Sequence, residues 1–254
     1  DFTKLADKLW GKKNVSTAAV FLQKSRPDSE PVLHLIANRT FSNANKLFLE
    51  FDYYDFHFMS KNDAIFKPYT WKAHLLGGGR ITSLIERLST LPTLKEFLKE
   101  KERKEGWCVG IGYIIGDKSN KADFITGKET IPVEALTENG IDEKQIHECL
   151  IQRFERPRKT KKKIYEGPHI LIRVITGNQG IPIAYSEKYL TFPFGIIGIH
   201  APQDDKSELS ALYDYLRENN SLLRSYIVYS LLLWRGLGRG FNLLVLRQTK
   251  FTSG

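Results

Sequence analysis

The sequence predicts an α/β protein in which a β-hairpin and a helical segment precede a mixed α+β domain. Two short apolar runs near the N-terminus have the length of strands, and residues 81–98 carry apolar side chains at helical spacing. From residue 105 onward strand-like runs return, and two helical patterns close the sequence. With 254 residues, of which 41% are hydrophobic, the chain can bury a core in one large domain or two small ones.

The N-terminal part is predicted to hold a helix and a hairpin. Asp1–Trp10 has apolar residues at the spacing of a helix with one buried face. Thr17–Leu22 is a continuous apolar run, typical of a strand covered on both faces. Pro31–Ala37 is a second expected strand, after the turn residues Arg26–Ser29. Because an isolated two-stranded hairpin is marginal in water, we expect these strands to join a larger sheet.

A helical region is predicted next. Residues 81–88 and 94–98 each give an apolar helical face, on either side of Pro92. The Lys- and Glu-rich stretch Lys99–Glu105 is interpreted as a solvated helix end, and the main domain junction is placed there.

The second domain is predicted to begin with a glycine-rich strand. Trp107–Ile115 is β-prone, and its glycines indicate bulges or places where another backbone comes close. A helix capped by Asp142 is expected over Asp142–Phe154. The remaining expected elements are strands over Ile170–Ile175, Ile181–Tyr185 and Phe194–His200, a helix from Ser207, and a largely buried helix over Leu222–Trp234. The chain is thus divided into residues 1–70, 71–104 and 105–254.

Composition excludes several protein classes. No run of eighteen apolar residues occurs, and the N-terminal residues do not form a signal peptide. Cys108 and Cys149 are too few for a disulfide framework, which favours a reducing cytoplasm. A single methionine, Met59, and an aspartate at position 1 indicate a piece of a longer protein. We therefore expect a soluble, cytoplasmic protein without a membrane partner.

Positive charge is concentrated in one stretch, residues 153–163, which we name the basic segment. It holds seven bases and one acid, a net charge of +6, out of +9 for the whole chain. A concentration of this kind usually has a polyanion as its partner, and nucleic acid is the commonest one. A solvated, mobile loop without a partner is the alternative interpretation.

The sequence predicts no catalytic, cofactor-binding or metal-binding residues in this chain. Gly110–Gly116 superficially matches a dinucleotide fingerprint, but it lies within a strand-like run and not at a strand-to-helix turn. Gly77–Gly79 precedes a helix and is interpreted as a hinge, with a phosphate contact as the alternative. The histidines lack metal-ligand spacing, and the carboxylates form no recognisable acid–base pair.

A DNA contact surface is predicted instead. The basic segment would supply phosphate contacts, which position a protein without reading sequence. Asn, Gln and Arg are suited to bidentate base recognition, and a Gly-Asn-Gln-Gly turn presents two of these residue types, although it is also an ordinary turn. The predicted DNA-binding residues are Arg153, Arg156, Arg158, Lys159, Lys161, Lys162, Lys163, Arg173, Asn178, Gln179, Arg235 and Arg239.

The order of elements resembles the C-terminal half of the restriction-modification N-6 adenine DNA methyltransferases. Ser16–Lys24 is similar to the family's late catalytic-domain strand, and Phe66–Leu76 to the connector that follows it. Gly106–Gly116 resembles the opening of the target-recognition domain, Tyr165–Arg173 one of its strands, and Phe194–Ile199 its closing part. The resemblance covers nearly the whole chain, but its motifs are diffuse.

This resemblance implies a function for each of the three parts. Residues 1–70 would be the last strands of a Rossmann-like methyltransferase domain, 71–104 a helical connector and 105–254 the domain that recognises double-stranded DNA. The family's FxGxG-type loop and its catalytic Asn/Asp-Pro-Pro-Tyr/Phe tetrapeptide are both missing, since the chain contains no Pro-Pro. S-adenosylmethionine and methyl transfer would then belong to an upstream catalytic domain, and no cofactor is expected in this fragment.

Two other functions remain open at this stage. The chain could be a protein-interaction or scaffold module that docks partner subunits without reading DNA. It could also be an enzyme of a class that the sequence does not reveal.

Overall fold

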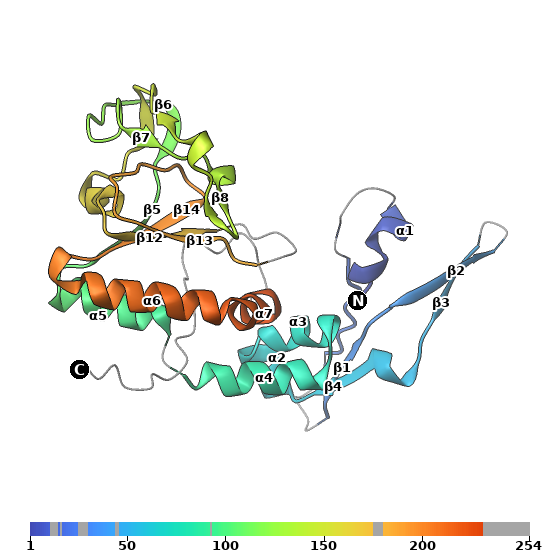
Figure 1. The fold of residues 1–254 in the computed structure, drawn as a ribbon. Helices are drawn as coiled ribbons and strands as arrows, with labels where there is room; N and C mark the ends of the chain where they lie inside the picture. The colour runs from blue at the N-terminus through green and yellow to red at the C-terminus, as the bar shows by residue number, and fades with distance from the viewer. Residues whose placement is uncertain are drawn as a thin grey trace. The chain divides into compact units, whose positions relative to one another are not determined.

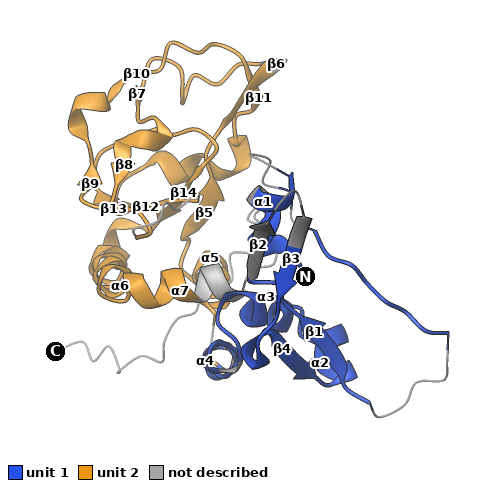
Figure 2. Ribbon diagram, turned by 90° about the vertical axis from the view of Figure 1, so that its right-hand side faces the viewer, with its two compact units in different colours: residues 1–90, 226–234 blue, residues 91–225, 235–254 orange. Residues whose placement is uncertain are grey.

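The computed structural model describes residues 1–10, 15, 17–24, 30–43, 46–91, 93–174 and 180–230. Within them, the chain consists of helices and several small antiparallel sheets (Figure 1), which confirms the mixed α/β class. It forms two compact units (Figure 2): unit 1 comprises residues 1–90 and 226–234, and unit 2 comprises residues 91–225 and 235–254. The stretch predicted as a connector, 71–104, is thus shared between the two units.

Unit 1 combines short helices with two separate two-stranded sheets. Strand β1 (Val32–Leu35) pairs with β4 (Phe56–Met59), and β2 (Arg39–Asn43) pairs with β3 (Lys46–Glu50), both antiparallel. The helices are η1 (Thr3–Leu5), α1 (Ala6–Trp10), η2 (Tyr53–Asp55), α2 (Lys61–Phe66), α3 (Tyr69–Leu76) and α4 (Gly79–Ser89). The helix predicted at the N-terminus and the helical region after residue 70 are therefore confirmed.

The predicted N-terminal hairpin is wrong. Residues 17–22 form no strand, and the side chains of Val20, Phe21 and Leu22 are exposed. The second predicted strand does form, as β1, but its partner is β4, which lies more than twenty residues further along the chain. An apolar run becomes a buried strand only where a sheet covers it, and no such sheet covers residues 17–22 among the described residues.

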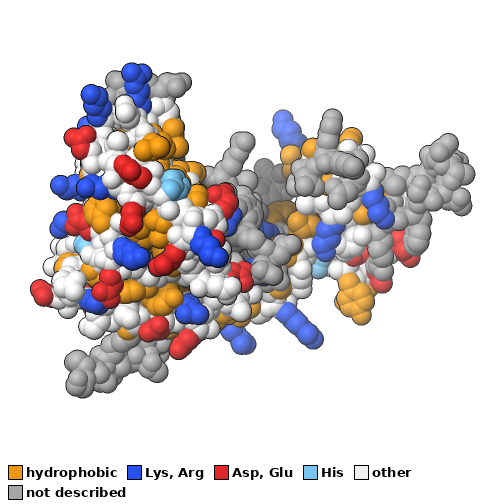
Figure 3. Space-filling view, turned by 45° about the horizontal axis from the view of Figure 1, so that its top comes forward, with side chains coloured by type: hydrophobic (Ala, Val, Ile, Leu, Met, Phe, Trp, Pro, Cys, Tyr) orange, Lys and Arg blue, Asp and Glu red, His pale blue; other side chains and the backbone are white. Residues whose placement is uncertain are grey.

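Unit 1 leaves much of its apolar surface uncovered. In the β1–β4 ribbon, Leu33, Phe56 and Phe58 share one face with Leu35, and they are 47%, 42% and 66% exposed. Hydrophobic side chains are also visible on the surface of unit 1 in Figure 3. Of the exposed large hydrophobic side chains in the described residues, all but those of Ile115, Leu150 and Phe194 belong to unit 1.

Unit 2 is built on a four-stranded antiparallel sheet in the order β13-β12-β14-β5. The strands are β5 (Cys108–Ile111), β12 (His169–Arg173), β13 (Ile183–Ser186) and β14 (Ile196–His200). All residues of β14 and the first four of β12 are buried, so both strands are covered on both faces. This explains why their sequences are continuous apolar runs without alternation. The strands predicted in these regions are confirmed.

Two helices lie side by side along this sheet, α5 (Leu94–Lys104) and α6 (Lys206–Glu218) (Figure 1). A capping box starts α5: Thr93 Oγ accepts from the Glu96 main-chain N–H at 3.1 Å, and the Glu96 carboxylate accepts from the Thr93 N–H at 3.0 Å. Leu209, Leu212 and Leu216 form the buried face of α6. A further helix, α7, spans Asn220–Ser230, and the rest of the helix predicted to Trp234 lies outside the described residues.

The rest of unit 2 consists of short ribbons and 3-10 turns. The ribbons pair β6 (Ile114–Asn120) with β11 (Phe154–Arg156), β7 (Glu129–Thr130) with β10 (His147–Glu148), and β8 (Leu136–Thr137) with β9 (Gly140–Ile141). The 3-10 turns are η3 (Val133–Ala135), η4 (Glu143–Gln145), η5 (Lys159–Tyr165) and η6 (Gln203–Asp205). These elements and the sheet enclose one hydrophobic core.

The helix predicted over Asp142–Phe154 is wrong. Asp142 does cap a helical turn, since its side chain accepts from the Lys144 main-chain N–H at 3.2 Å, but that turn, η4, ends at Gln145. Strands β10 and β11 follow it. The backbone of this stretch pairs with β6 and β7, and Cys149 and Phe154 enter the core from it. Tertiary pairing therefore overrides the local helical preference.

One of the glycines after Trp107, Gly112, marks a close backbone approach, one of the two features that the sequence predicts there. Gly112 lies between β5 and β6, and a Cβ atom there would overlap the main-chain oxygens of Phe192 and Pro193. Gly110 has more room, because its Cβ would meet the Ile164 side chain at 3.4 Å. No helix follows Gly112, so this stretch is not a strand-to-helix turn of the dinucleotide-binding type.

We predict that Gly112→Ala destabilises unit 2 by about 2–3 kcal/mol, because the added methyl group must displace rigid backbone. Amide hydrogen exchange of β12 and β14 measures this, since their slowest amides report the unfolding free energy of the unit. Gly110→Ala is the matched control and is expected to cost less than about 1 kcal/mol. Equal effects of the two substitutions would contradict this account of the glycines.

Candidate nucleic-acid interface

The second half of the basic segment is a 3-10 turn. Arg158 precedes it with a left-handed backbone, φ 65°, and η5 covers Lys159–Tyr165. The Arg158 side chain is used within the fold, because its Nε donates to the main-chain oxygen of Gly112 at 3.2 Å.

The apolar end of η5 fixes it to the sheet. Ile164 and Tyr165 are fully buried in the core of unit 2. His169 Nδ1 lies 2.8 Å from the main-chain oxygen of Ile164, and His200 Nδ1 lies 2.8 Å from that of Glu166. Because a carbonyl oxygen can only accept, both imidazoles donate. Burial lowers the pKa of His169 to about 4, so this ring stays neutral near pH 7.

A groove of about 550 Å³ runs between the end of α5 and η5. Its residues from α5 and the start of β5 are Lys99, Glu102, Arg103, Gly106, Trp107 and Cys108. Its residues from the other side are Lys159–Lys163. We name this hollow the basic groove. All of it lies within unit 2.

The basic groove carries a large excess of positive charge. Its lining includes Lys or Arg side chains at positions 99, 103, 159, 161, 162 and 163, and one carboxylate, that of Glu102. Lys161 forms an ion pair with Glu102. No ion pair is formed by the other five cations within the described part of the chain. By contrast, acidic and basic side chains are interspersed on the face of unit 2 seen in Figure 3.

This arrangement can bind a chain of phosphates. Lysine and arginine side chains that line one groove from two elements can displace the counterions of a polyanion. Ammonium groups act as point charges and do not distinguish one base from another. The basic groove therefore suits a sequence-independent backbone contact.

The other predicted DNA-binding residues are distributed more widely. Arg153 and Arg156 are exposed, and the Nε of Arg156 lies 3.8 Å from the Glu155 carboxylate. Arg173 is at the far end of β12 from η5, about 13 Å along the strand at its usual rise per residue. Asn178, Gln179, Arg235 and Arg239 lie outside the described residues.

Lys99 and Arg103 are the cations of the groove that are absent from the predicted DNA-binding residues. They are four residues apart on α5, so they project from the same side of the helix. This spacing is visible in the sequence, but the stretch also carries glutamates and was interpreted as a solvated helix end. These two residues become part of a groove only because η5 packs beside α5.

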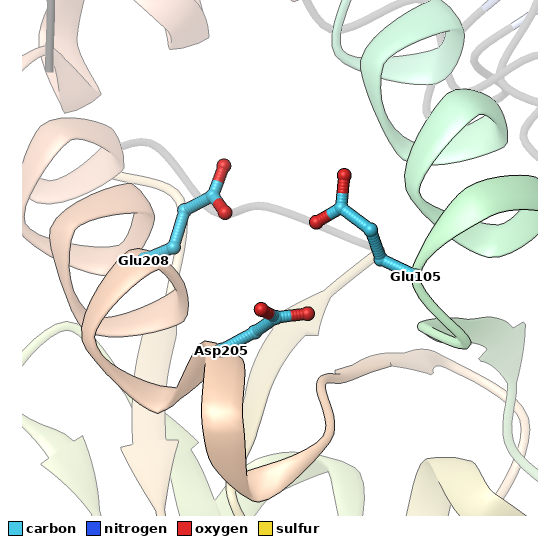
Figure 4. Close-up of side chains that lie close together, drawn as sticks. All are labelled: Glu105, Asp205 and Glu208. Atoms are coloured by element: carbon cyan, nitrogen blue, oxygen red, sulfur yellow. The ribbon is translucent and has the colours of Figure 1, made fainter.

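A second charged cluster links α5 to α6, and a lysine bridges two of its three carboxylates. The carboxylates of Glu105, Asp205 and Glu208 face one another (Figure 4), with oxygens within 4.8 Å. Lys101 Nζ lies 2.5 Å from Glu105 and 2.6 Å from Glu208, and the Trp107 indole N–H donates to Asp205 at 2.8 Å. Although burial opposes it, hydrogen bonding to Glu105 and Glu208 raises the pKa of Lys101. Two of the three carboxylates are thus paired with Lys101, and the third accepts from a neutral indole.

Three histidines gather in unit 1, between the β1–β4 ribbon and α3. The rings of His57 and His74 stack with centroids 4.7 Å apart, and His34 lies 5.9 Å from His74 and 5.0 Å from Trp71. His34 and His74 are buried, and the Nδ1 atom of each has no hydrogen-bond partner. Their nitrogens do not meet the spacing that the Glu105 cluster satisfies. We therefore treat them as part of the core of unit 1.

Burial keeps these histidines neutral. It lowers the pKa of His34 to about 4, with the nearby N-terminal ammonium acting in the same direction. Burial, and then the neighbouring His57 and His34, lower the pKa of His74 to about 4. The pKa of His57 is also lowered, mainly by burial.

Comparison with known proteins leaves these geometric observations to carry the functional argument. A scan against protein-family models gives no match to this chain. Curated proteins give no match either. Solved structures likewise give none. Among the described residues, no helix has the length and apolar character needed to cross a membrane.

We predict that unit 1 loses stability as the pH falls from 6.5 towards 4. Between these pH values the histidines of the unfolded chain become protonated, whereas the buried histidines of the folded chain stay neutral. Above pH 6.5 the histidines are neutral in both states, so they do not make the stability depend on pH. Because one pKa unit corresponds to about 1.4 kcal/mol, unit 1 should be several kcal/mol less stable near pH 4 than near pH 7.

Urea titrations of chain labelled with 5-fluorotryptophan measure this, since the ¹⁹F resonance of Trp71 reports on the histidine cluster. The double substitution His57→Gln and His74→Gln should reduce the pH dependence to the part that His34 causes, and His147→Gln, at an exposed position of unit 2, should leave it unchanged. A dependence of the same size in both variants would show that other groups cause it.

Proposed function

We propose that unit 2 binds double-stranded DNA along the basic groove, as part of the target-recognition domain of a restriction-modification N-6 adenine DNA methyltransferase. The observation that carries the proposal is the presence of five cations without ion pairs among the described residues, Lys99, Arg103, Lys159, Lys162 and Lys163, on two elements that buried side chains anchor in unit 2. The function implies a cytoplasmic protein of bacterial type. The family resemblance supplies the kind of nucleic acid and the reaction of the parent enzyme.

A rigid backbone contact is useful to a protein that reads sequence elsewhere. Phosphate contacts fix the register and orientation of the duplex, so that other side chains can reach base edges. Arg173 at the end of β12, and Asn178 and Gln179 just after it in the sequence, are of the types that recognise bases. Arg235 and Arg239 would add further contacts. In this proposal, the basic groove supplies affinity and these residues supply specificity.

The uncovered surface of unit 1 supports the other half of the proposal. Its β1–β4 ribbon has an apolar face, and its strands pair with only one neighbour each among the described residues. Such strands are normally completed by a larger sheet. We propose that this sheet belongs to an upstream Rossmann-like catalytic domain, which binds S-adenosylmethionine and receives the target adenine after it has been flipped out of the duplex. This chain itself would then perform no chemistry.

A scaffold function is the second candidate, and the same surface of unit 1 favours it. Exposed aromatic side chains such as Phe56, Phe58 and Tyr53 are typical of surfaces that dock other proteins. A scaffold would be indifferent to DNA, so binding to duplex separates the two functions.

We predict that the chain binds a labelled, randomised duplex with an affinity that falls steeply as salt is added. Replacing Lys159, Lys162 and Lys163 with Gln should weaken binding by on the order of 10- to 100-fold and reduce the slope of log K against log salt by about 3, since three phosphate contacts are lost. Fluorescence anisotropy across a salt series measures both quantities.

The matched control replaces Lys121, Lys128 and Lys144, three exposed lysines of unit 2 outside the groove. It removes the same charge and should change the slope by less than about 1. Equal losses in the two variants would mean that only total charge matters. Absence of binding even at low salt would favour the scaffold.

A further inference from the structure

Glu102 is the one carboxylate that lines the basic groove in the described part of the chain. A negative charge at this place opposes the binding of phosphates, so its presence needs a physical reason. The contacts of Glu102 give that reason, because one of its oxygens connects α5 with β5 and η5.

The Oε1 atom of Glu102 accepts two hydrogen bonds. One comes from the main-chain N–H of Val109 in β5, at 2.9 Å, and the other from Lys161 Nζ in η5. The Glu102 side chain is 28% exposed and that of Lys161 is 41% exposed. Through this carboxylate the end of α5 is joined to the sheet and to the basic segment at once.

Lys161 is the residue at which η5 departs from helical geometry. Its backbone has φ −125° and ψ 25°, within an otherwise 3-10 turn. Its main-chain oxygen lies 3.9 Å from Cys108 Sγ. A Cβ atom on Gly110 would lie 3.5 Å from the Cβ of Lys161, so Lys161 packs closely over β5. Its neighbours Lys162 and Lys163 are exposed.

We propose that Glu102 is the positioning residue of the basic groove: by holding Lys161 against α5 and β5, it fixes the directions in which Lys159, Lys162 and Lys163 present their charges. The identity of the polyanion rests on the proposed function, whereas the ordering of η5 by Glu102 does not. Lys161, in turn, serves the fold of the groove and contributes less to phosphate binding than its neighbours.

The proposal makes a prediction opposite in sign to simple electrostatics. If only net charge mattered, Glu102→Gln would remove one repulsive charge and strengthen binding to DNA. If Glu102 positions the lysines, the same substitution releases Lys161 and spreads the directions of its neighbours. Binding then weakens although the groove has become more positive.

The experiment compares Glu102→Gln with Glu155→Gln in the whole chain, using a labelled randomised duplex across a salt series. Glu155 is a matched control, because it lies in the basic segment and pairs loosely with Arg156 without bridging two elements. We expect Glu155→Gln to bind about twofold more tightly. We expect Glu102→Gln to bind roughly fivefold or more weakly, with the salt slope reduced by about 1–2. If the substitution only lowered the fraction of folded protein, the apparent affinity would fall but the slope of log K against log salt would stay the same.

Amide hydrogen exchange of residues 159–165, without DNA, provides a readout that is independent of the proposed function. Exchange there should be faster in Glu102→Gln and unchanged in Glu155→Gln. The proposal is overturned if Glu102→Gln binds as tightly as the wild type or more tightly, or if exchange in η5 is unaffected. If the wild-type chain binds no duplex, the proposed function fails, and the exchange result alone decides whether Glu102 orders η5.

Discussion

The candidate site depends on the burial of two residues at the end of a highly charged segment. Lysines repel one another, and a run such as Lys159–Lys163 would be mobile without an anchor. Ile164 and Tyr165 follow it directly and are fully buried, and His169 and His200 donate to the main-chain oxygens of Ile164 and Glu166. The hydrophobic core thereby holds the lysines beside α5, and a charged stretch of sequence becomes one wall of a defined groove.

Part of unit 2 could be predicted because two strands of its sheet, β12 and β14, are buried on both faces. The continuous apolar runs around Ile170 and Ile197 can bury all their side chains only in a sheet that is covered on both faces, and they form β12 and β14. The segment from Asp142 to Phe154 could not be predicted in this way, because its conformation is set by pairing with β6 and β7. In unit 1, Thr17–Leu22 has the composition of a strand but lacks a sheet to cover it among the described residues.

The candidate site could be predicted only in part, for a similar reason. The charge of residues 153–163 is evident from the sequence, and Lys159, Lys162 and Lys163 do line the groove. The contribution of Lys99 and Arg103 depends on which element packs beside α5, and no local pattern contains that information. Arg158 and Lys161 look like DNA contacts in the sequence, yet both bind to the protein itself, through Gly112 and Glu102. The sequence shows where charged residues are concentrated. Which of them pair within the protein, and which remain available to a ligand, depends on tertiary contacts.

The most direct test of the central claim is a map of where duplex DNA slows amide hydrogen exchange in the intact chain. The account predicts slower exchange in α5 and in η5, the two walls of the basic groove, with smaller changes elsewhere in unit 2. Binding that leaves both segments unprotected, or that protects unit 1 alone, would contradict it and assign the DNA contact to another surface.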